Sequence, residues 1–156
     1  MRQRFFNTSF FLTILVLGLT AKGQIVNPAV TPNTLTKVYS IDSLKSFAIG
    51  YSGTVLKTKD GGKTWKNINA NLKYRLFDIQ FTSASIAYIA ASNGKIFKTT
   101  DTTHSWVMQN PGTDLHLYSL YFTSSSDGFV VGGGTLAEGN FEGIILKTTD
   151  GGKKQN

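Results

Sequence analysis

Carboxylates are the side chains of this sequence that could do chemistry, and three aspartates recur in one short context. Asp60 stands in KTKDGGKTW, Asp101 in KTTDTTHSW and Asp150 in KTTDGGKKQN. Two carboxylates about 5–10 Å apart can hydrolyse a glycosidic bond. A carboxylate in a turn can instead accept hydrogen bonds from the backbone N–H groups of that turn. We interpret these aspartates as structural; a catalytic or metal-binding role is the alternative.

The acidic residues outside these turns form no recognisable pair. Asp78 lies in an alternating apolar and polar pattern and Asp127 in a Ser-rich stretch, so we interpret both as solvated or turn-capping. The complete set is Asp42, Asp78, Asp114, Asp127, Glu138 and Glu142. We therefore predict no catalytic residue, and a glycoside hydrolase is the alternative function.

Other reactive constellations are absent from the sequence. The chain has no cysteine, which excludes thiol catalysis and cysteine metal sites. His104 and His116 have no ligand pattern around them, so we expect solvated or strand-edge histidines. Gly132–Gly134 lack the Lys-Ser/Thr of a phosphate loop and are predicted to form a turn. Ser124–Ser126 lack a G-x-S-x-G context. We predict neither a metal nor a cofactor.

The first residues are typical of an export signal. Arg2 and Arg4 precede an apolar run over 10–19, and small residues follow up to Gly23. About 10 apolar residues are too few to span a bilayer, which needs about 20. We predict a signal peptide over 1–23, with an uncleaved anchor as the alternative. The product is then exported to the periplasm, the outer surface or the medium.

The charge of the chain does not indicate a nucleic-acid partner. The formal net charge is +7, but three basic residues, Arg2, Arg4 and Lys22, belong to the predicted signal. The remaining lysines are scattered, with no basic run of the kind that marks a nucleic-acid surface. We therefore expect no nucleic acid among the partners.

The elements that must position the three turns are short strands. In the second copy, LFDIQF (76–81) alternates as a half-buried strand does, and IAYIAA (86–91) is continuously apolar, as in a buried strand. GKIFKTT (94–100) and SWVMQ (105–109) follow as third and fourth strands. Asn93-Gly94 and Ser52-Gly53 are hairpin signals. No helical periodicity is present after the signal, so the fold class is all-β.

The strands repeat as a unit of about 40 residues, which is typical of a β-propeller blade of four antiparallel strands. After a linker over 24–34, we predict blades over 35–70, 71–110 and 111–152, then a truncated tail over 153–156. The extra residues of the third copy fit between its second and third strands, around GTLAEGNFE. The chain thus supplies about two and a half to three blades.

A closed propeller needs about four to eight blades. Three explanations are therefore open for this partial propeller. The chain is a fragment of a longer propeller, it associates with copies of itself to close a ring, or it stands as a small open arc with exposed strand edges. The first is our main interpretation.

The turn pattern resembles the Asp-box of bacterial neuraminidase-type repeats. With F-T-S before the buried strand and G-x-[IV]-[FL]-K-T-x-D-G-G-x-T-W after it, the whole unit is similar to photosystem II stability/assembly factor-like propellers. The residues that match the box are Thr58, Asp60, Gly62, Thr64, Trp65, Thr99, Asp101, Ser105, Trp106, Thr148, Asp150 and Gly152. The glycines allow positive φ.

The box also carries a tryptophan in its first two copies. Trp65 is expected to pack between blades and to bury about 200 Å². Thr103 replaces the glycine in the second copy, so we expect a turn with altered backbone geometry. The third copy has Lys154 and Gln155 in place of Thr and Trp, and its last strand is missing.

The resemblance implies two kinds of function, a sialidase and an assembly factor. Sialidases clamp a substrate carboxylate with three arginines, whereas the predicted mature chain has only Arg75, so this polypeptide alone is not a sialidase. Assembly factors imply a scaffold for a membrane complex, with an arginine-rich patch that this chain lacks. We predict a secreted, non-catalytic interaction module with a protein partner or envelope complex; a glycan is a further possible partner. The alternative that the resemblance implies is a carbohydrate-active Asp-box propeller of the glycoside hydrolase type, incomplete in this chain. Tyr51, Tyr74 and Tyr118 are expected on loops, mainly in packing roles.

Overall fold

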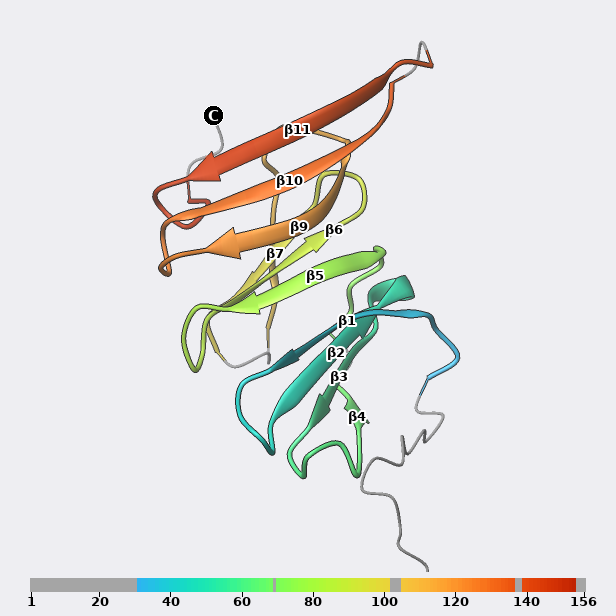
Figure 1. Ribbon diagram of the computed structural model, residues 1–156, viewed down its shortest axis with the longest axis vertical. Helices are drawn as coiled ribbons and strands as arrows, with labels where there is room; N and C mark the ends of the chain where they lie inside the picture. Colours follow the sequence, from blue (N-terminus) through green and yellow to red (C-terminus); the bar gives the residue numbers. More distant parts are fainter. Residues whose placement is uncertain (1–30, 69, 102–104, 137–138, 154–156) are drawn as a thin grey trace, which may run out of the picture.

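The chain folds into eleven strands and no α-helix within the residues described by this computed structural model, which are 31–68, 70–101, 105–136 and 139–153 (Figure 1). The strands are β1 (Leu35–Ser40), β2 (Ser46–Gly50), β3 (Val55–Thr58), β4 (Lys66–Asn67), β5 (Leu76–Phe81), β6 (Ala87–Ala91), β7 (Ile96–Thr99), β8 (Val107–Gln109), β9 (His116–Phe122), β10 (Gly128–Thr135) and β11 (Phe141–Thr148). A single 3-10 turn, η1 (Tyr51–Gly53), joins β2 to β3. The all-β prediction is confirmed.

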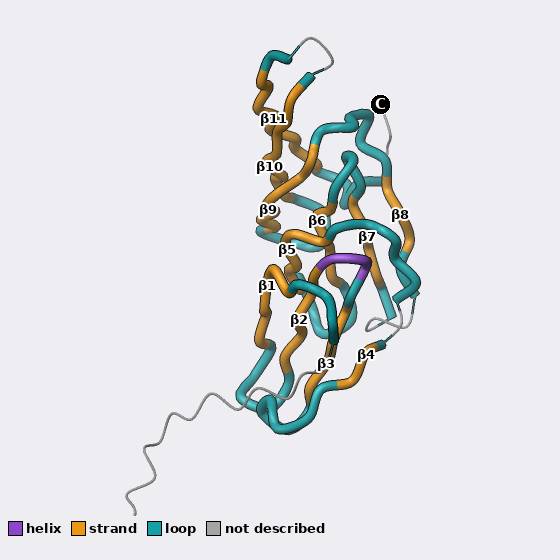
Figure 2. The backbone as a smooth tube through the Cα atoms, turned by 90° about the vertical axis from the view of Figure 1, so that its right-hand side faces the viewer, coloured by secondary structure: helices purple, strands orange, loops and turns teal. Residues whose placement is uncertain are grey.

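The strands form three antiparallel sheets, which we call the first, second and third blades. Their strand orders are β1-β2-β3-β4, β5-β6-β7-β8 and β11-β10-β9. The three sheets fan out from the inner strands β1, β5 and β9, and the outer strands β4 and β8 lie on the far side (Figure 2). This is the arrangement of a partial β-propeller, as the repeat predicts.

Local sequence explains the strand pairs of the second blade. The side chains of β5 alternate largely between buried and half-buried positions, while all five residues of β6 are buried. Asn93 and Gly94 both take positive φ (57° and 66°), as a two-residue hairpin turn requires. Ser52 and Gly53 do the same in the first blade (55° and 69°). Both predicted hairpins are confirmed.

The third blade contains a long hairpin of β10 and β11, which pair from Gly128 with Thr148 to Thr135 with Phe141. The extra residues of the third copy therefore lengthen its second and third strands and the loop between them. The prediction of a turn at Gly132–Gly134 is wrong, because all three lie inside β10. A Cβ at Gly132 would lie 2.1 Å from the carbonyl oxygen of His116, so the close approach of β9 explains that glycine.

Two apolar clusters hold the blades together. The first lies between the first and second blades and includes Phe47, Ile79 and Ile89, each at most 1% exposed. The second lies between the second and third blades, where the rings of Tyr88 and Phe122 stack at 3.9 Å. Because each cluster takes side chains from two sheets, the blades stabilise one another rather than folding around separate cores.

Polar contacts also cross both blade interfaces, and they overturn the interpretation of Asp78 as solvated or turn-capping. Its carboxylate is buried and lies 3.1 Å from Nζ of Lys37 on the first blade. It also accepts hydrogen bonds from the hydroxyl of Ser119 (2.8 Å) and the N–H of Leu120 (3.0 Å) on the third. One carboxylate thus joins the inner strands β1, β5 and β9. The alternation of apolar and polar residues over 76–81 could not show that the polar residues of this strand face strands of the neighbouring blades.

The predicted domain boundaries remain predictions. The signal peptide over 1–23 and most of the linker over 24–34 lie outside the described residues, as do 154–156 of the predicted tail. The strands of each blade fall within 35–70, 71–110 and 111–152. No helix in the described part of the chain is long and apolar enough to cross a membrane.

Candidate functional site

The turn after β3 is held by a closed set of hydrogen bonds around Asp60. Oδ1 accepts from the hydroxyl of Thr58 (2.8 Å) and the N–H of Thr64 (2.9 Å). Oδ2 accepts from the hydroxyl of Thr64 (2.5 Å). The N–H of Gly62 donates in turn to the Thr58 hydroxyl (3.0 Å). Both carboxylate oxygens are therefore engaged within the turn itself.

These hydrogen bonds change the acidity of Asp60. Donation from the Thr64 hydroxyl, then from the Thr64 N–H and the Thr58 hydroxyl, lowers the pKa of Asp60 to about 2. Hydrogen bonds to the charged form favour ionisation. A general acid for hydrolysis near neutral pH needs a raised pKa. Asp60 has the opposite property, which suits a turn anchor.

The second turn repeats the contacts of Asp60, and the described part of the third turn repeats the threonine contacts. Asp101 accepts from the hydroxyl of Thr99 (2.8 Å) and from the N–H and hydroxyl of Ser105 (2.9 and 2.6 Å). Asp150 accepts from the hydroxyl of Thr148 (3.0 Å). The backbone at Thr103 lies outside the described residues, so its predicted altered geometry stays a prediction. The naming of the three turns as Asp-boxes also stays a prediction from sequence.

The two tryptophans differ in their packing. Trp106 packs against the first cluster, between the first and second blades, and its buried Nε1 has no hydrogen-bond partner. Trp65 is half-buried and belongs to neither described cluster. Packing between blades, which was expected for Trp65, is thus seen at Trp106. The face of the first blade that Trp65 would cover has no neighbouring blade among the described residues.

The remaining candidates for catalysis are engaged in hydrogen bonds within turns or between blades. Asp127 accepts from the hydroxyls of Ser124 and Ser126, which lower its pKa, so it caps its turn as predicted. Asp42 accepts from the N–H groups of residues 44 and 45, and these bonds lower its pKa too. Nδ1 of His116 accepts from the N–H of Asn93 (3.2 Å). Within the described ranges, no three His, Asp or Glu side chains are grouped as metal ligands.

The aromatic candidates lie against other side chains. The Arg75 guanidinium lies 5.0 Å from the ring centre of Tyr51, so the single arginine of the predicted mature chain stacks on a neighbouring aromatic. Tyr74 packs on the first cluster. Tyr118 is not on a loop as expected but in β9, where it is half-exposed next to Phe77.

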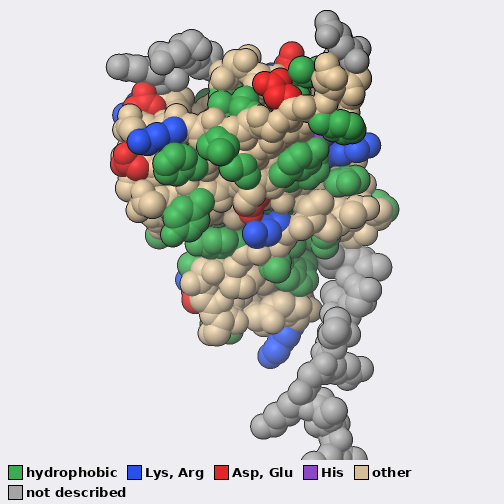
Figure 3. All heavy atoms as spheres, turned by 45° about the horizontal axis from the view of Figure 1, so that its top comes forward, with side chains coloured by type: hydrophobic (Ala, Val, Ile, Leu, Met, Phe, Trp, Pro, Cys, Tyr) green, Lys and Arg blue, Asp and Glu red, His purple; other side chains and the backbone are tan. Residues whose placement is uncertain are grey.

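The strongest candidate site is an exposed apolar surface, which we call the open face. It is the side of the third blade that points away from the second. Its residues and their exposed fractions are Tyr121 (66%), Phe129 (45%), Val131 (42%), Phe141 (88%) and Ile145 (74%). Hydrophobic side chains gather over this sheet in Figure 3. Contiguous exposed apolar surfaces are typical of interaction sites.

The equivalent face of each other blade is buried under the next blade. The positions that match Phe129, Val131 and Ile145 are at most 8% exposed in the other two blades. They are Phe47, Ile49 and Val55 in the first blade and Tyr88, Ala90 and Ile96 in the second. The open face therefore corresponds to a blade interface, and none of the described blades covers it.

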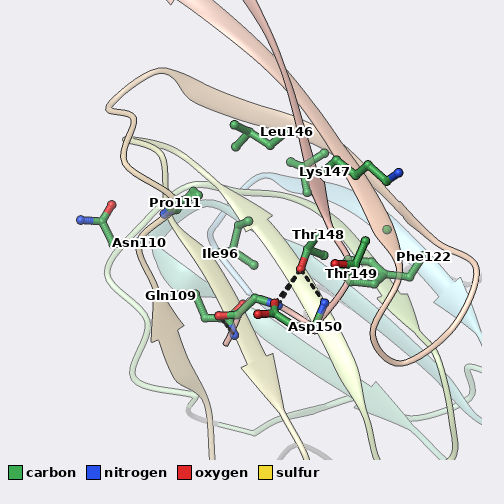
Figure 4. A pocket seen from close by; sticks show the side chains of 13 residues that line it. Ile96, Gln109, Asn110, Pro111, Phe122, Leu146, Lys147, Thr148, Thr149 and Asp150 are labelled. Atoms are coloured by element: carbon green, nitrogen blue, oxygen red, sulfur yellow. Dashed lines mark hydrogen bonds between the residues drawn. The ribbon is translucent and has the colours of Figure 1, made fainter. Parts of the chain in front are cut away.

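A cavity of about 420 Å³ lies between the second and third blades. Figure 4 shows Leu146 above Ile96 and Pro111, with Thr148 beside Ile96 and Asp150 below them. Gln109 lies at its wall, where Nε2 donates to the carbonyl oxygens at 151 and 152 (3.1 and 3.0 Å). The sequence signal for this cavity is Gln155, which stands where the first two copies have a tryptophan.

Comparison with known proteins identifies the fold. No protein-family model and no curated protein matches the sequence. The solved structure of YCF48 bound to a D1 peptide has a TM-score of 0.64 at 22% identity, covering 80% of this chain and 39% of that chain. YCF48 from Cyanidioschyzon merolae has a TM-score of 0.60 at 19% identity, covering 76% and 38%. An ancestral GH74 enzyme has a TM-score of 0.59 at 14% identity, covering 81% and 18%.

At these identities the likeness concerns the fold and not the activity. The chain spans less than two fifths of the length of each YCF48 chain, in line with three blades of a larger propeller. The sequence-based resemblance to photosystem II assembly factor-like propellers is confirmed at this level. In fold, the chain is a partial, YCF48-like β-propeller.

Proposed function

We propose that the chain is an exported, non-catalytic propeller module that binds a protein partner through the open face. The observation that carries this proposal is the exposure of Phe129, Val131 and Ile145 at positions that are buried in both other blades. Leaving such side chains in water forgoes roughly 1.5–3 kcal/mol each relative to full burial. A bound partner would recover part of that free energy.

The module acts as part of a larger assembly. The outward side of the first blade also exposes apolar residues, with Leu35 at 44% and Val38 at 60%. A propeller closes with about four to eight blades. Further blades, either in a longer polypeptide or in copies of this chain, would cover both ends. An envelope complex is the expected setting, because the predicted signal peptide over 1–23 directs the chain out of the cytoplasm.

The likeness to YCF48 supports a protein as the partner. A propeller of this fold has been solved with a D1 peptide bound, so the architecture is compatible with peptide recognition. Exposed aromatics such as Tyr121 also suit a glycan, which is the second kind of ligand we consider. The scattered lysines support the absence of a nucleic-acid partner.

A glycoside hydrolase is the alternative function, favoured by the likeness to the GH74 propeller. The contacts of the described carboxylates argue against hydrolase activity, because Asp60 and Asp101 accept hydrogen bonds within their turns and Asp78 forms an ion pair between blades. Incubation of the purified chain with aryl-glycosides and mixed glucans tests the alternative. Sugar release above that of a heat-treated sample would refute the non-catalytic proposal.

A capture experiment tests the interaction surface. The chain from Gln24 onward is immobilised and exposed to envelope extract, beside the variants Ile145→Lys and Leu44→Lys. Ile145 lies on the open face, whereas the equally apolar Leu44 (56% exposed) lies in the turn between β1 and β2. We expect one defined partner with the parent chain and Leu44→Lys, and its loss with Ile145→Lys. Equal capture by both variants would contradict the proposal, and N-terminal sequencing of the native protein would test cleavage before Gln24.

A further inference from the structure

One end of the first blade combines exposed aliphatic and basic side chains. It consists of the turn between β1 and β2 and the turn between β3 and β4, which lie at the lower end of Figure 1, opposite β11. The two turns are in contact, because the N–H of Gly61 donates to the carbonyl oxygen of Leu44 (2.9 Å). We call this surface the basic tip, and its exposed residues are Ile41, Leu44, Lys45, Lys59 and Lys63.

The two aliphatic side chains of the basic tip are exposed to water. Ile41 is 41% exposed and Leu44 is 56% exposed, and neither belongs to a described apolar cluster. The other two blades have small polar residues at the matching positions. These are Thr82 and Ser85 in the second blade and Thr123 and Ser126 in the third. The fold of the turn therefore does not require aliphatic residues at 41 and 44, which points to a role on the outside of the molecule.

The lysines of the basic tip crowd positive charge into a small area. Lys45 pairs with Asp42 at 3.5 Å, whereas Lys59 and Lys63 form no ion pair with a described residue. Burial lowers the pKa of the neighbouring Lys57, and the positive charges of Lys59 and Lys45 lower it further. Like charges that lie close together repel one another, and a negatively charged partner would relieve this repulsion.

This positive charge is a property of the first blade and not of the repeat. Residues 41–63 contain four lysines and two aspartates, which gives a formal charge of +2. The equivalent residues 82–104 contain two lysines and one aspartate, a charge of +1, and 123–153 contain two lysines and four acidic residues, a charge of −2. Lysines that are scattered along the sequence are thus brought together where the two turns of the first blade meet.

We propose that the basic tip attaches the protein to an anionic membrane surface, with Ile41 and Leu44 entering the headgroup region and the lysines facing lipid phosphates. Proteins that bind at a membrane interface combine exposed apolar side chains with surrounding Lys or Arg. Lysine suits such a surface because its ammonium group is a hydrated point charge that needs no fixed partner geometry. An acidic protein segment would match the charge as well, but two projecting turns fit a flat surface better than an extended peptide.

This inference goes beyond the proposed protein interaction and uses another surface. The open face belongs to the third blade, which lies at the opposite end of the molecule from the basic tip (Figure 1). Membrane attachment and binding of a protein partner can therefore occur at the same time. Such a combination would suit a module that acts on an envelope complex.

Sedimentation with lipid vesicles tests the attachment directly. The purified chain from Gln24 onward, which lacks the predicted signal peptide, is mixed with vesicles of phosphatidylcholine alone or of phosphatidylcholine with phosphatidylglycerol. We expect binding to the anionic vesicles only, and weaker binding at high salt, because salt screens the attraction between lysine and phosphate. Equal binding to both kinds of vesicle, or binding to neither, would overturn the proposal.

Variants that copy the second blade separate the charged from the apolar contribution. Lys59→Thr, which introduces the residue found at position 100, should weaken binding to anionic vesicles roughly fivefold, the usual contribution of one lysine at such a membrane. Lys73→Thr is the matched control, because Lys73 is exposed near the opposite end of the first blade, and it should leave binding unchanged. The double variant Ile41→Thr, Leu44→Ser should weaken binding roughly tenfold. Unchanged binding of the double variant, or equal effects of the two lysine variants, would also overturn the proposal.

A soluble polyanion distinguishes a membrane from phosphate charge alone. Polyphosphate offers phosphate groups but no apolar phase, so it should bind more weakly than anionic vesicles do. The double variant should bind polyphosphate as the parent chain does. Equal affinity of the parent chain for polyphosphate and for anionic vesicles would show a general polyanion site and would refute membrane attachment.

A polarity-sensitive dye shows which part of the protein meets the lipid. Because the chain has no cysteine, Leu44→Cys provides a single attachment point at the basic tip. Leu136→Cys is the control, since Leu136 is similarly exposed (43%) in the turn between β10 and β11. We expect anionic vesicles to shift the emission of the dye to the blue at position 44 and not at position 136. No shift at 44, or the same shift at both positions, would contradict attachment through the tip.

The outcomes for the two surfaces are separable. If vesicle binding fails but Ile145→Lys still loses the captured protein, only the membrane attachment is refuted. If the parent chain binds anionic vesicles but the capture experiment recovers no partner, the open-face proposal is refuted instead.

Discussion

Asp78→Ala is expected to destabilise the chain more than any other substitution of an acidic residue. The carboxylate of Asp78 joins all three blades, since it pairs with Lys37 on β1 and accepts hydrogen bonds from Ser119 and Leu120 on β9. The hydrogen bonds described above for the turn aspartates stay within their own turns. Removal of Asp78 therefore weakens two blade interfaces at once.

The magnitude follows from what remains after the substitution. The N–H of Leu120 stays buried at 5% residue exposure and loses its acceptor, which costs about 1–3 kcal/mol. The ion pair with Lys37 adds about 1 kcal/mol, because that side chain is 46% exposed and can be hydrated again. We expect a loss of about 3 kcal/mol in the free energy of unfolding. Lys37→Met should cost only about 1 kcal/mol, since the carboxylate keeps its N–H and hydroxyl donors.

Urea unfolding followed by circular dichroism measures both values. Asp78→Asn is the matched control, because its amide oxygen can still accept from Leu120, and it should fall between the other two variants. A loss below about 1 kcal/mol for Asp78→Ala would refute the reasoning. A cost of Lys37→Met equal to or above that of Asp78→Ala would refute it as well, because the account ranks the buried acceptor above the half-exposed cation.

Three further predictions concern the turns and the blade interface. The pKa of Asp60 is lowered to about 2 from its usual 3.8, so the stabilisation by its carboxylate is present above about pH 4 and is lost as the pH falls toward 2. Asp60→Asn should therefore flatten the decline of the urea midpoint in that pH window, and an unchanged decline would contradict this prediction. Gly53→Ala should lower the free energy of unfolding by about 3 kcal/mol, since φ is +69° and the added Cβ would lie 1.4 Å from a carbonyl oxygen. Gly139→Ala, at φ +82° with nothing within 4 Å of the added Cβ, should lower it by about 1 kcal/mol, and equal thermal midpoints of the two variants would be inconsistent with the clash. Trp106→Phe should change the free energy of unfolding by less than about 1 kcal/mol, because the buried Nε1 has no hydrogen-bond partner to lose. Trp106→Ala should cost about 2–3 kcal/mol in the same urea assay, and a larger cost for phenylalanine than for alanine would refute this ranking.

The regular parts of the fold were predictable because they follow local rules. The period-two pattern of 76–81 gives β5 with the predicted bounds, and Asn93-Gly94 forms the predicted hairpin. The repeat also placed the additional residues of the third copy between its second and third strands, where β10 and β11 extend. Hydrophobic periodicity and turn chemistry were sufficient at each of these places.

The errors concern contacts between strands that are distant in the sequence, which no local pattern contains. Gly132–Gly134 resembled a turn, but they lie inside β10, where neighbouring strands leave no room for a Cβ at Gly132. Asp78 fitted a solvated strand position, but that position faces the inner strands of two other blades. The open face has the same origin, since alternation in β10 showed which residues share a face but not that the face is uncovered.

Site-directed photocrosslinking in intact cells tests the central claim most directly. A photoreactive residue is placed at Ile145 on the open face or, as a control, at Leu44 in the turn between β1 and β2. The account predicts a defined crosslinked protein, identified by mass spectrometry, from position 145 and not from position 44. A product from position 44 alone, or no product from position 145, would contradict the claim that the open face of the third blade is the interaction surface.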